Sequence, residues 1–455
     1  MVNTIGRTDA AVLPSVPRSP LSYRQQLKLF TTIPVAAQEI LRDAGGTLTR
    51  VKLVPRWVGP EFVFALSPSG ARCILGEPGR STDRTPIHDE VRSLLGDSLF
   101  TVRNDHWVPR KRALQPVFMK PNVRAFGGHM AQAAQTVVAG WADGQVVDLD
   151  ASCRRLTLRA LGRSVLGIDL DELADSIGES MHTALTYITA RAMTPFKPPH
   201  WLPTPGRHRA RAAAAHLYDM AAQILRTCRD DPGHDAPLVR SMMAATDPDT
   251  GQALSDAEIC ADLVIFMLAG HDTTATTLTY ALWALGRHPD LQARVRAEAH
   301  AIGDREITPD DLPGLTYTVQ VIHEALRLFP PGPANHRLIT QDMEVDGHLV
   351  KAGTVALVGI YAMHRDPALW EHPLEFDPDR FNPEQSKGRD RWQYIPFSAG
   401  PRTCIGDHFA MLEATLALAT IVRHTEVQSL HDVFPPALPF TMTADGPIHA
   451  RVRSV

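Results

Sequence analysis

The residues of most chemical interest form a short loop around one cysteine. The loop, Phe-Ser-Ala-Gly-Pro-Arg-Thr-Cys-Ile-Gly, runs from Phe397 to Gly406 and places Cys404 just before a long apolar helical pattern. Gly400 and Gly406 permit backbone geometry and a close approach that a side chain would block. Loop N–H groups and the start of the following helix stabilise a thiolate, which is a strong axial ligand for a haem iron. The alternative is a free cysteine buried on a tight turn.

Two other side chains of the loop agree with a haem site. Arg402 carries a permanent cation that can pair with a haem propionate, and Phe397 would cover the proximal face of the ring and exclude water. The spacing Phe-x-x-Gly-x-Arg-x-Cys-x-Gly resembles the haem-binding signature of the cytochrome P450 superfamily, with every defined position matched. The resemblance implies a mainly α fold with small β-sheets, built as a single integrated domain. It also implies haem b (iron protoporphyrin IX) between a long central helix and the helix after the cysteine, with Cys404 as the metal ligand.

A polar segment interrupts the longest apolar helical pattern, Ser255–Gly286. This segment, Ala269-Gly-His-Asp-Thr-Thr274, is costly inside an apolar helix, and its Asp and Thr side chains can open the helix locally. The alternative is a polar face turned toward a neighbouring helix. The segment matches the P450 motif Ala/Gly-Gly-x-Asp/Glu-Thr-Thr, which implies that Ala269 lies against the haem. Thr273 and Asp272 are then the expected catalytic pair, which delivers protons during O2 activation.

A charged pair stands near the end of a later predicted helix. Glu324 and Arg327 lie at positions i and i+3 and therefore share one helical face. Exposed pairs of this kind are common and contribute little. The pair matches the Glu-x-x-Arg motif of the P450 family, which implies a buried network completed by a later arginine, and the segment Phe376–Phe381 supplies Arg380. The expected role is structural, because breaking a buried ion pair is strongly destabilising.

Further cations are expected at the haem propionates. The pattern Trp107-x-x-x-Lys111 resembles the family's Trp-x-x-x-Arg, with lysine at the arginine position, so the charge is kept and the bidentate fork is lost. Arg110 or Arg112 can substitute, although helical spacing from Trp107 favours Lys111. Arg337 matches a second propionate-binding position of the family. The alternative for all these cations is an ordinary solvated surface.

The bulk properties agree with a P450 that acts on small molecules. The chain has 455 residues, 44% of them hydrophobic, and a net charge of -4, which disfavours a nucleic-acid binder. Its five cysteines form no CxxC pair, which indicates a reducing compartment and a cytoplasmic protein. No apolar run is long enough for a membrane anchor. We expect a flexible segment over residues 1–20, a haem domain over residues 21–455, and a monomer.

The elements that must position these residues follow from apolar periodicity. Helices are predicted over Asn122–Trp141, Asp150–Leu166, Leu173–Ala192, Arg207–Arg229, Ser255–Gly286 and Leu291–Ala301. Strands are predicted over Thr47–Val54, Phe62–Leu66, Met343–Val350 and Thr354–Ile360. Ser255 and Glu258 have the spacing of a capping box at the start of the longest helix.

Some regions are assigned to substrate or partner by resemblance alone. Substrate contacts are expected from a loop over about Thr85–Leu99, from Phe266 and Ala269, from Pro333–Asn335 and from Leu438–Phe440. Met193–Pro205 is either a semi-rigid lid over the entrance or a packed surface loop. A basic rim can steer an acidic ferredoxin or can simply be solubilising; its members are Arg110, Lys111, Arg112, Lys387, Arg389 and Arg391.

The resemblance implies a haem-thiolate monooxygenase that activates O2. It would hydroxylate or epoxidise an apolar small molecule such as a fatty acid, terpenoid, steroid or polyketide. No flavin or iron–sulfur domain is fused, so NAD(P)H electrons would arrive through a separate ferredoxin and ferredoxin reductase, or a flavodoxin-type donor. The alternatives are a peroxide-driven peroxygenase and a non-catalytic haem-binding or sensor protein. The intact Asp272–Thr273 pair disfavours both.

Overall fold

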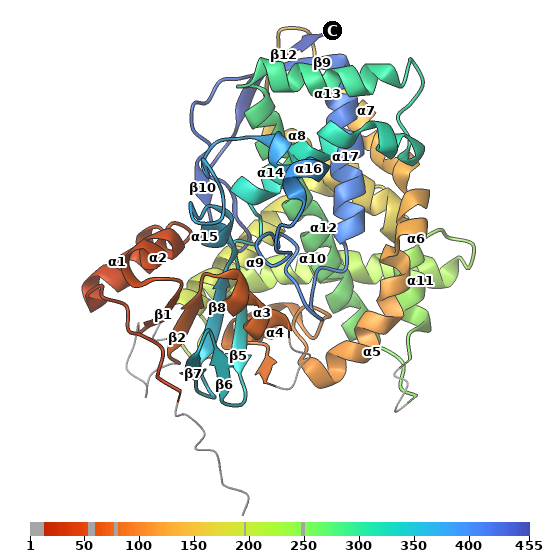
Figure 1. Ribbon diagram of the computed structural model, residues 1–455. Helices are drawn as coiled ribbons and strands as arrows, with labels where there is room; N and C mark the ends of the chain where they lie inside the picture. The colour runs from red at the N-terminus through yellow and green to blue at the C-terminus, as the bar shows by residue number, and fades with distance from the viewer. Residues whose placement is uncertain (1–12, 53–59, 77–80, 195–196, 247–250) are drawn as a thin grey trace, which may run out of the picture.

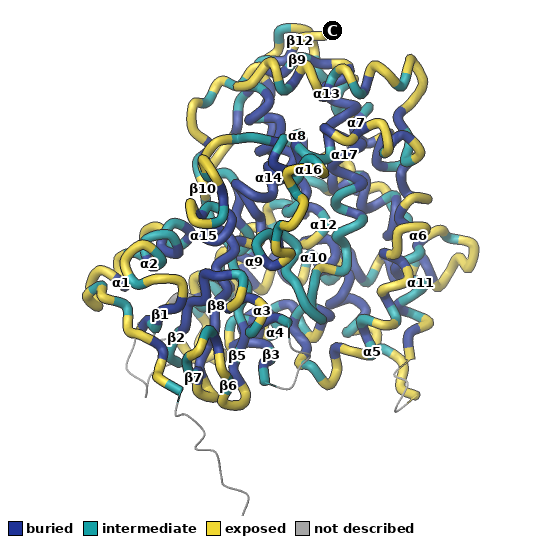
Figure 2. Tube along the Cα trace, viewed as in Figure 1, coloured by how far each residue is buried: buried dark blue, intermediate teal, exposed yellow. Residues whose placement is uncertain are grey.

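Helices make up most of the molecule, and the largest sheet lies at one side, next to the N-terminal helices (Figure 1). The computed structural model describes residues 13–52, 60–76, 81–194, 197–246 and 251–455. Figure 2 shows that the buried residues follow the central helices, while the exposed ones follow the outer helices and the loops. The mainly α architecture with small β-sheets matches the prediction.

The helices vary widely in length. The α-helices are α1 Tyr23–Thr32, α2 Ala37–Gly45, α3 Pro68–Gly76, α4 Pro86–Leu95, α5 Asn104–Leu114, α6 Lys120–Ala125, α7 Gly127–Ala139, α8 Leu149–Leu161, α9 Ala174–Met193, α10 Pro205–Asp230, α11 Pro237–Ala244, α12 Asp256–Leu285, α13 Pro289–Ala301, α14 Thr316–Leu328, α15 Ile360–His364, α16 Pro383–Ser386 and α17 Asp407–His424. The short 3₁₀ and π segments are η1 Gln115–Phe118, η2 Gly162–Leu166, η3 Asp171–Leu173, η4 Pro309–Gly314 and η5 Pro378–Phe381.

The strands form one five-stranded sheet and three smaller sheets. The five-stranded sheet has the order β1-β2-β8-β5-β3; β2 and β8 are parallel, and the other neighbours are antiparallel. The strands are β1 Leu48–Val51, β2 Phe62–Ala65, β3 Thr82–Asp83, β4 Val146–Asp148, β5 Ala334–Ile339, β6 Met343–Val345, β7 His348–Val350, β8 Val355–Gly359, β9 Thr425–Ser429, β10 Pro436–Ala437, β11 Thr443–Ala444 and β12 His449–Ser454. The sheet carries Arg337 on β5, directly opposite Ala356 on β8.

Helix α12 is the central element of the helical part, and nearly all of its residues are buried. It begins as predicted, because the Ser255 hydroxyl accepts the Glu258 N–H and the Glu258 carboxylate accepts the Ser255 N–H. Helices α8, α10, α14 and α17 pack around it. A helix buried on all sides holds its polar residues in a fixed frame, which a catalytic segment requires.

Several predicted elements differ from the structure. The strand expected over Met343–Val350 is the hairpin of β6 and β7, with positive φ at Asp346 and Gly347 in its turn. The helix expected over Asn122–Trp141 is divided at Phe126 into α6 and α7, where two successive glycines lower helix propensity. The loop expected over Thr85–Leu99 is mostly the helix α4, which begins with Pro86 at its first position. Residues 13–20 were expected to be flexible, but Val16 is buried and residues 15 and 18 form bridges to residues 349 and 50. Residues 1–12 and 53–54 of the predicted segments lie outside the described residues.

Candidate functional site

The cysteine loop closes on itself directly before α17. The Cys404 N–H donates to the Phe397 carbonyl at 2.9 Å, and the Thr403 hydroxyl donates to the same carbonyl at 3.2 Å. Phe397 is half-buried and packs against the main hydrophobic core. These bonds turn the chain so that Cys404 stands at the mouth of the loop and the first turn of α17 follows at once.

Gly400 is required by the geometry of this loop. Its φ is +75°, and a Cβ at this position would overlap the carbonyl oxygen of Leu75 in α3. At Gly406, by contrast, a Cβ would meet no protein atom within 4 Å and φ is negative. The predicted need for a glycine therefore holds at Gly400, whereas no protein neighbour imposes it at Gly406.

Gly400→Ala should destabilise the protein by about 3 kcal/mol, because it adds the strain of a left-handed backbone to a steric overlap. Gly388→Ala is the matched control, since Gly388 also has positive φ (+82°) but nothing lies within 4 Å of its Cβ. The measurement is the thermal unfolding midpoint of each purified variant. Equal midpoints for the two variants would contradict the role given to the Leu75 contact.

Cys404 combines accessibility with a desolvated sulfur. The residue is exposed, yet burial raises the pKa of its thiol to about 11, although the Gly406 N–H and the charge of Lys111 act to lower it. Both observations hold together if the sulfur faces an enclosed space. A thiol with this pKa is protonated at neutral pH, whereas a coordinating metal ion deprotonates it outright. In the described part of the chain, no group of three or more His, Cys, Asp or Glu side chains could hold a metal ion.

A cluster of buried arginines lies next to the cysteine loop. The charges of Arg337 and Arg402 lower the pKa of Arg84, the charge of Arg337 also lowers that of Arg402, and Asp83 is the carboxylate that opposes these shifts. Burial is the largest cause, and it brings the pKa values of Arg337 and Arg402 down to about 10. Nε of Arg84 and Nη1 of Arg402 are buried without a hydrogen-bond partner. A surplus of buried positive charge with unpaired N–H groups fits a dianionic group, such as the two carboxylates of haem.

The sequence did not indicate Arg84 or the partner that orients Arg402. Asn104, at the start of α5, accepts from Nε and Nη2 of Arg402 at 3.1 and 2.8 Å. Arg84 follows β3 and binds Nε2 of His88 at 3.1 Å. A lone arginine and a lone asparagine carry no motif, so only the three-dimensional arrangement reveals them.

Trp107 and Lys111 pack against the cysteine loop. The Lys111 ammonium donates to the Pro401 carbonyl at 2.6 Å and lies 5.0 Å from the Trp107 ring, and the Arg402 guanidinium lies 4.6 Å from the same ring. The neighbouring Arg110 turns away, toward Glu258 and the Asp97 carbonyl, and Arg112 is exposed. Of the three cations considered in the sequence, Lys111 is therefore the one beside the cysteine loop.

The Ala269–Thr274 segment lies in the middle of α12, as the sequence predicts. Ala269 is exposed and Thr273 is half-buried, although the helix around them is buried, so these two residues border accessible space. The expected opening of the helix is not present: α12 continues unbroken, and the Thr273 hydroxyl donates to the Ala269 carbonyl at 2.7 Å. Gly270 has a packing role, because a Cβ there would lie 2.8 Å from Leu161 of α8.

Asp272 is a fixed anion. Its two carboxylate oxygens accept from Arg154 of α8 and from the hydroxyl of Thr441. Burial alone would raise the pKa of Asp272, but the charge of Arg154 and these two hydrogen bonds outweigh it and lower the pKa. Arg154 also binds Asp150 at 2.7 Å. Asp272 is therefore ionised at neutral pH, and the Arg154 side chain, which is 27% exposed, links it toward solvent.

A second acidic group near this segment was missed in the sequence. Glu413 of α17 is fully buried, neither of its carboxylate oxygens has a hydrogen-bond partner within normal distance, and the Thr274 side chain is the polar group that acts to lower its pKa. Burial raises the pKa of Glu413 well above its usual value. The side chain is thus an acid held between α17 and α12 in surroundings that disfavour its ionisation, and its apolar neighbours in the sequence give no sign of this.

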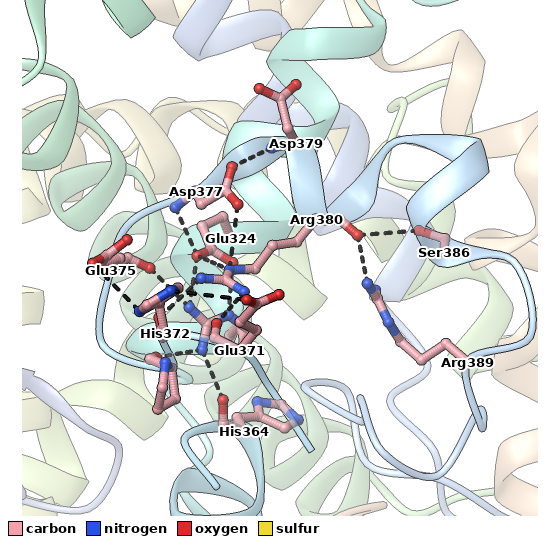
Figure 3. A network of polar contacts seen from close by, with 12 residues as sticks. Glu324, His364, Glu371, His372, Glu375, Asp377, Asp379, Arg380, Ser386 and Arg389 are labelled. Carbon is pink, nitrogen blue, oxygen red and sulfur yellow. Dashed lines mark hydrogen bonds and ion pairs between the residues drawn. The ribbon is translucent and has the colours of Figure 1, made fainter. Parts of the chain in front are cut away.

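Glu324 and Arg380 lie in one polar network (Figure 3), and Arg327 is the buried ion-pair partner of Glu324. Arg327 donates to both oxygens of Glu324 at 2.6 and 2.7 Å, and both side chains are fully buried. Arg380 Nε lies 3.5 Å from the same carboxylate. Arg327 also donates to the carbonyls of residues 364, 373 and 375. The network thus ties α14 to the chain that leads into the cysteine loop.

Only part of the predicted basic rim lies on the surface of the described residues. Arg112, Lys387 and Arg391 are exposed. Arg389 turns inward, where it donates to the Arg380 carbonyl and lies 4.7 Å from the Trp370 ring. Arg110 and Lys111 are engaged as described above, so three of the six cations remain on the surface.

Comparison with known proteins decides the family. The family model described as Cytochrome P450 matches residues 33–447. The chain belongs to the cytochrome P450 family. It is 33% identical to cyclooctat-9-en-7-ol 5-monooxygenase of Streptomyces melanosporofaciens, over 88% of this chain and 84% of the relative. It is 31% identical to pentalenene oxygenase of Streptomyces avermitilis, over 77% of this chain and 79% of that protein.

The fold agrees with this P450 assignment. The crystal structure of the cytochrome P450DA heme domain superposes with a TM-score of 0.84 at 27% identity, over 98% of each chain. The protein is a cytochrome P450 monooxygenase, which is an oxidoreductase, and its family implies haem. None of the helices in the described part of this P450 is long and apolar enough to cross a membrane.

Proposed function

We propose that Cys404 is the proximal thiolate ligand of haem b and that the protein oxidises an alicyclic hydrocarbon of the terpenoid type. The observation that carries the first part is an accessible cysteine beside a surplus of buried cations. Support for the substrate comes from two relatives named for cyclooctat-9-en-7-ol and pentalenene. When bound, haem supplies the activation of O2 and its insertion into a C–H or C=C bond.

The residues of the chain hold the group and exclude water. The Gly406 N–H and the start of α17 stabilise the negative sulfur of Cys404. Arg337 and Arg402 would pair with the haem propionates, and Phe397 would shield the bound ring from water. Lys111 and Trp107 act through the loop: Lys111 fixes the Pro401 carbonyl, and the Trp107 ring lies beside both Lys111 and Arg402.

Asp272 and Thr273 deliver protons on the distal side. Thr273 borders the accessible space next to Ala269, so its hydroxyl can exchange its bond to the Ala269 carbonyl for one to a bound reactant. Asp272 passes protons inward after it exchanges one of its bonds to Arg154 or Thr441. This pair favours O2-dependent chemistry over a peroxide-driven peroxygenase or a non-catalytic sensor.

Electrons must reach the site from a separate protein. We propose a ferredoxin with its NAD(P)H-dependent reductase, or a flavodoxin-type donor, and a monomeric, cytoplasmic P450. The exposed Arg112, Lys387 and Arg391 supply positive charge for an acidic donor. High salt should therefore slow electron transfer more than it weakens substrate binding.

Thr273→Ala tests the distal part of the proposal. The variant should consume NAD(P)H at a rate close to wild type, but most of the electrons should end in hydrogen peroxide instead of product, because proton delivery by Thr273 is lost. Thr277→Ala is the matched control, since Thr277 also donates to the carbonyl four residues earlier, at 3.0 Å, but is buried. Product and peroxide per NAD(P)H are measured together. Unchanged coupling in Thr273→Ala would remove Thr273 from proton delivery.

A further inference from the structure

A second carboxylate, Asp262, is buried in α12 and has no part in the proposed chemistry. The residue is fully buried and is surrounded by apolar residues of the same helix. Burying an ionised carboxylate in such a place lowers the free energy of unfolding by roughly several kcal/mol unless the carboxylate is paired and hydrogen-bonded. Its contacts therefore indicate what it does.

Asp262 binds the main chain of a segment outside its own helix. Oδ1 accepts the Leu99 N–H at 2.5 Å, and Oδ2 lies 3.8 Å from Nε of Arg110 without a hydrogen bond of its own. Arg110 is anchored in turn by Glu258, one turn earlier on α12. The carboxylate thus links the 95–99 segment to α12.

Two other helices hold the same segment by its backbone. The Tyr218 hydroxyl of α10 donates to the Leu95 carbonyl at 2.8 Å, and Arg110 of α5 donates to the Asp97 carbonyl at 2.9 Å. We call Leu95–Leu99 the clasped segment. All three contacts are made to main-chain groups, so they fix the path of the chain whatever its side chains are.

The clasped segment leads directly into Phe100. The Phe100 ring lies 5.1 Å from that of His88 and 6.0 Å from that of Phe440, and the Arg84 guanidinium lies 5.1 Å from it. Phe100 and Phe440 are only half-buried. They join the α4 region to the Leu438–Phe440 tail, two parts of the chain expected to contact substrate. The path of the clasped segment therefore decides where this aromatic wall stands.

We propose that Asp262 is a positioning residue: through the Leu99 N–H it holds the clasped segment, and with it Phe100, as a wall against which bulky apolar substrates pack. This inference rests on the proposed function, because the wall matters only if a substrate binds beside it. A small ligand does not reach the wall, so Asp262 affects selectivity for large ligands.

Asp262 also makes the wall sensitive to pH. Burial raises its pKa to about 7, although Arg110 and the Leu99 N–H lower it. Three groups face it: Arg110 from α5, Glu258 from α12, whose pKa is lowered, and Tyr218 from α10, whose pKa is raised to about 12 so that it stays neutral. Protonation of Asp262 removes the charge that attracts Arg110 and weakens acceptance from Leu99. The wall should therefore loosen as pH falls through the neutral range.

The test compares two iron ligands, pyridine and 4-phenylpyridine, which are both neutral near pH 7 and differ in the bulk that meets the wall. Spectral titration of the haem protein gives both dissociation constants. Asp262→Leu should weaken the binding of 4-phenylpyridine about fivefold or more, while the dissociation constant of pyridine changes less than about twofold. The reason is that the Leu99 N–H loses its buried acceptor and nothing changes at the iron. Asp262→Asn keeps an acceptor oxygen, so it should retain most of the affinity but lose the pH dependence of the ratio.

Asp256→Asn is the matched control, because Asp256 lies on the same helix but is exposed and paired with Arg229. It should change neither constant. The proposal is overturned if Asp262→Leu weakens the binding of both ligands equally. It is also overturned if the ratio of the two dissociation constants in wild type does not change from about pH 6 to 8, about one unit either side of the Asp262 pKa. If Asp262→Leu does not fold, the Asn variant and the pH profile of wild type decide. If pyridine binds with a thiolate-type spectrum in all variants, the proposed function stands whatever the ratio of the two dissociation constants is.

Discussion

Replacing Arg327 by alanine is expected to abolish accumulation of the folded haem protein. Removing one partner of a buried ion pair costs about 3–5 kcal/mol, because the other charge stays buried without compensation. At this site the loss is larger than one pair, since three backbone carbonyls also lose their donor. A domain of ordinary stability has only about 5–15 kcal/mol to lose. Haem content and the thermal unfolding midpoint of the purified protein measure the effect.

The matched control for this experiment is Arg294→Ala. Arg294 binds Asp379 through two hydrogen bonds of 2.7 Å, but both side chains are more than one third exposed. Exposed pairs contribute about 0–1 kcal/mol, so this variant should unfold close to wild type. Arg327→Lys should recover little, because an ammonium cannot donate to both oxygens of Glu324 in the forked geometry of a guanidinium. A folded, haem-loaded Arg327→Ala protein with an unchanged midpoint would contradict the structural role of the network.

Asp272→Asn is expected to lower kcat by about 10²- to 10⁴-fold, the range for loss of a general acid–base group. The amide keeps the shape of the side chain and an acceptor for Arg154, but it cannot carry a proton inward. KM and substrate-induced spectral changes should stay close to wild type, because Asp272 is bonded to Arg154 and Thr441 rather than to a bound molecule. Turnover rate and solvent isotope effect are measured together, and the isotope effect should rise as proton delivery becomes slower.

Asp150→Asn separates proton delivery from local packing. Asp150 is the other carboxylate that binds Arg154, and its replacement should leave kcat within about threefold of wild type because it is not the donor group. A large fall in kcat for both variants would assign the effect to the position of Arg154. A normal kcat in Asp272→Asn would exclude Asp272 from the relay.

The residues that the sequence identified are those that belong to dense motifs. Two such motifs are the loop that holds Gly400, Arg402 and Cys404, and the helical pair Glu324 and Arg327. In each motif, several physical requirements together restrict the spacing of the residues. Their neighbourhoods in the structure agree with those requirements: Gly400 has positive φ against Leu75, and Glu324 and Arg327 are fully buried. Local spacing was sufficient to find these residues because the members of each motif lie within one loop or one helical turn, although their contacts also reach distant segments such as Leu75 of α3.

Residues that act across distant segments and belong to no family motif were not visible in the sequence. Arg84 joins the cation cluster from the end of β3, Asn104 orients Arg402 from α5, and Glu413 faces Thr274 from α17. Each depends on tertiary packing, which no short pattern encodes. The predicted opening of α12 at Thr273 was also wrong, because a threonine hydroxyl can bond to the carbonyl four residues earlier without breaking the helix.

The ligand of the haem iron is tested most directly by the carbon monoxide spectrum of the reduced protein. Ligation of the iron by Cys404 predicts a Soret band at the wavelength diagnostic of a thiolate ligand, and complete loss of that band in Cys404→Ala. Cys153→Ala is the control, because Cys153 is buried in α8 and burial raises the pKa of its thiol strongly; this variant should keep the band. A histidine-type band in wild type, or a thiolate-type band that survives in Cys404→Ala, would contradict the assignment of Cys404.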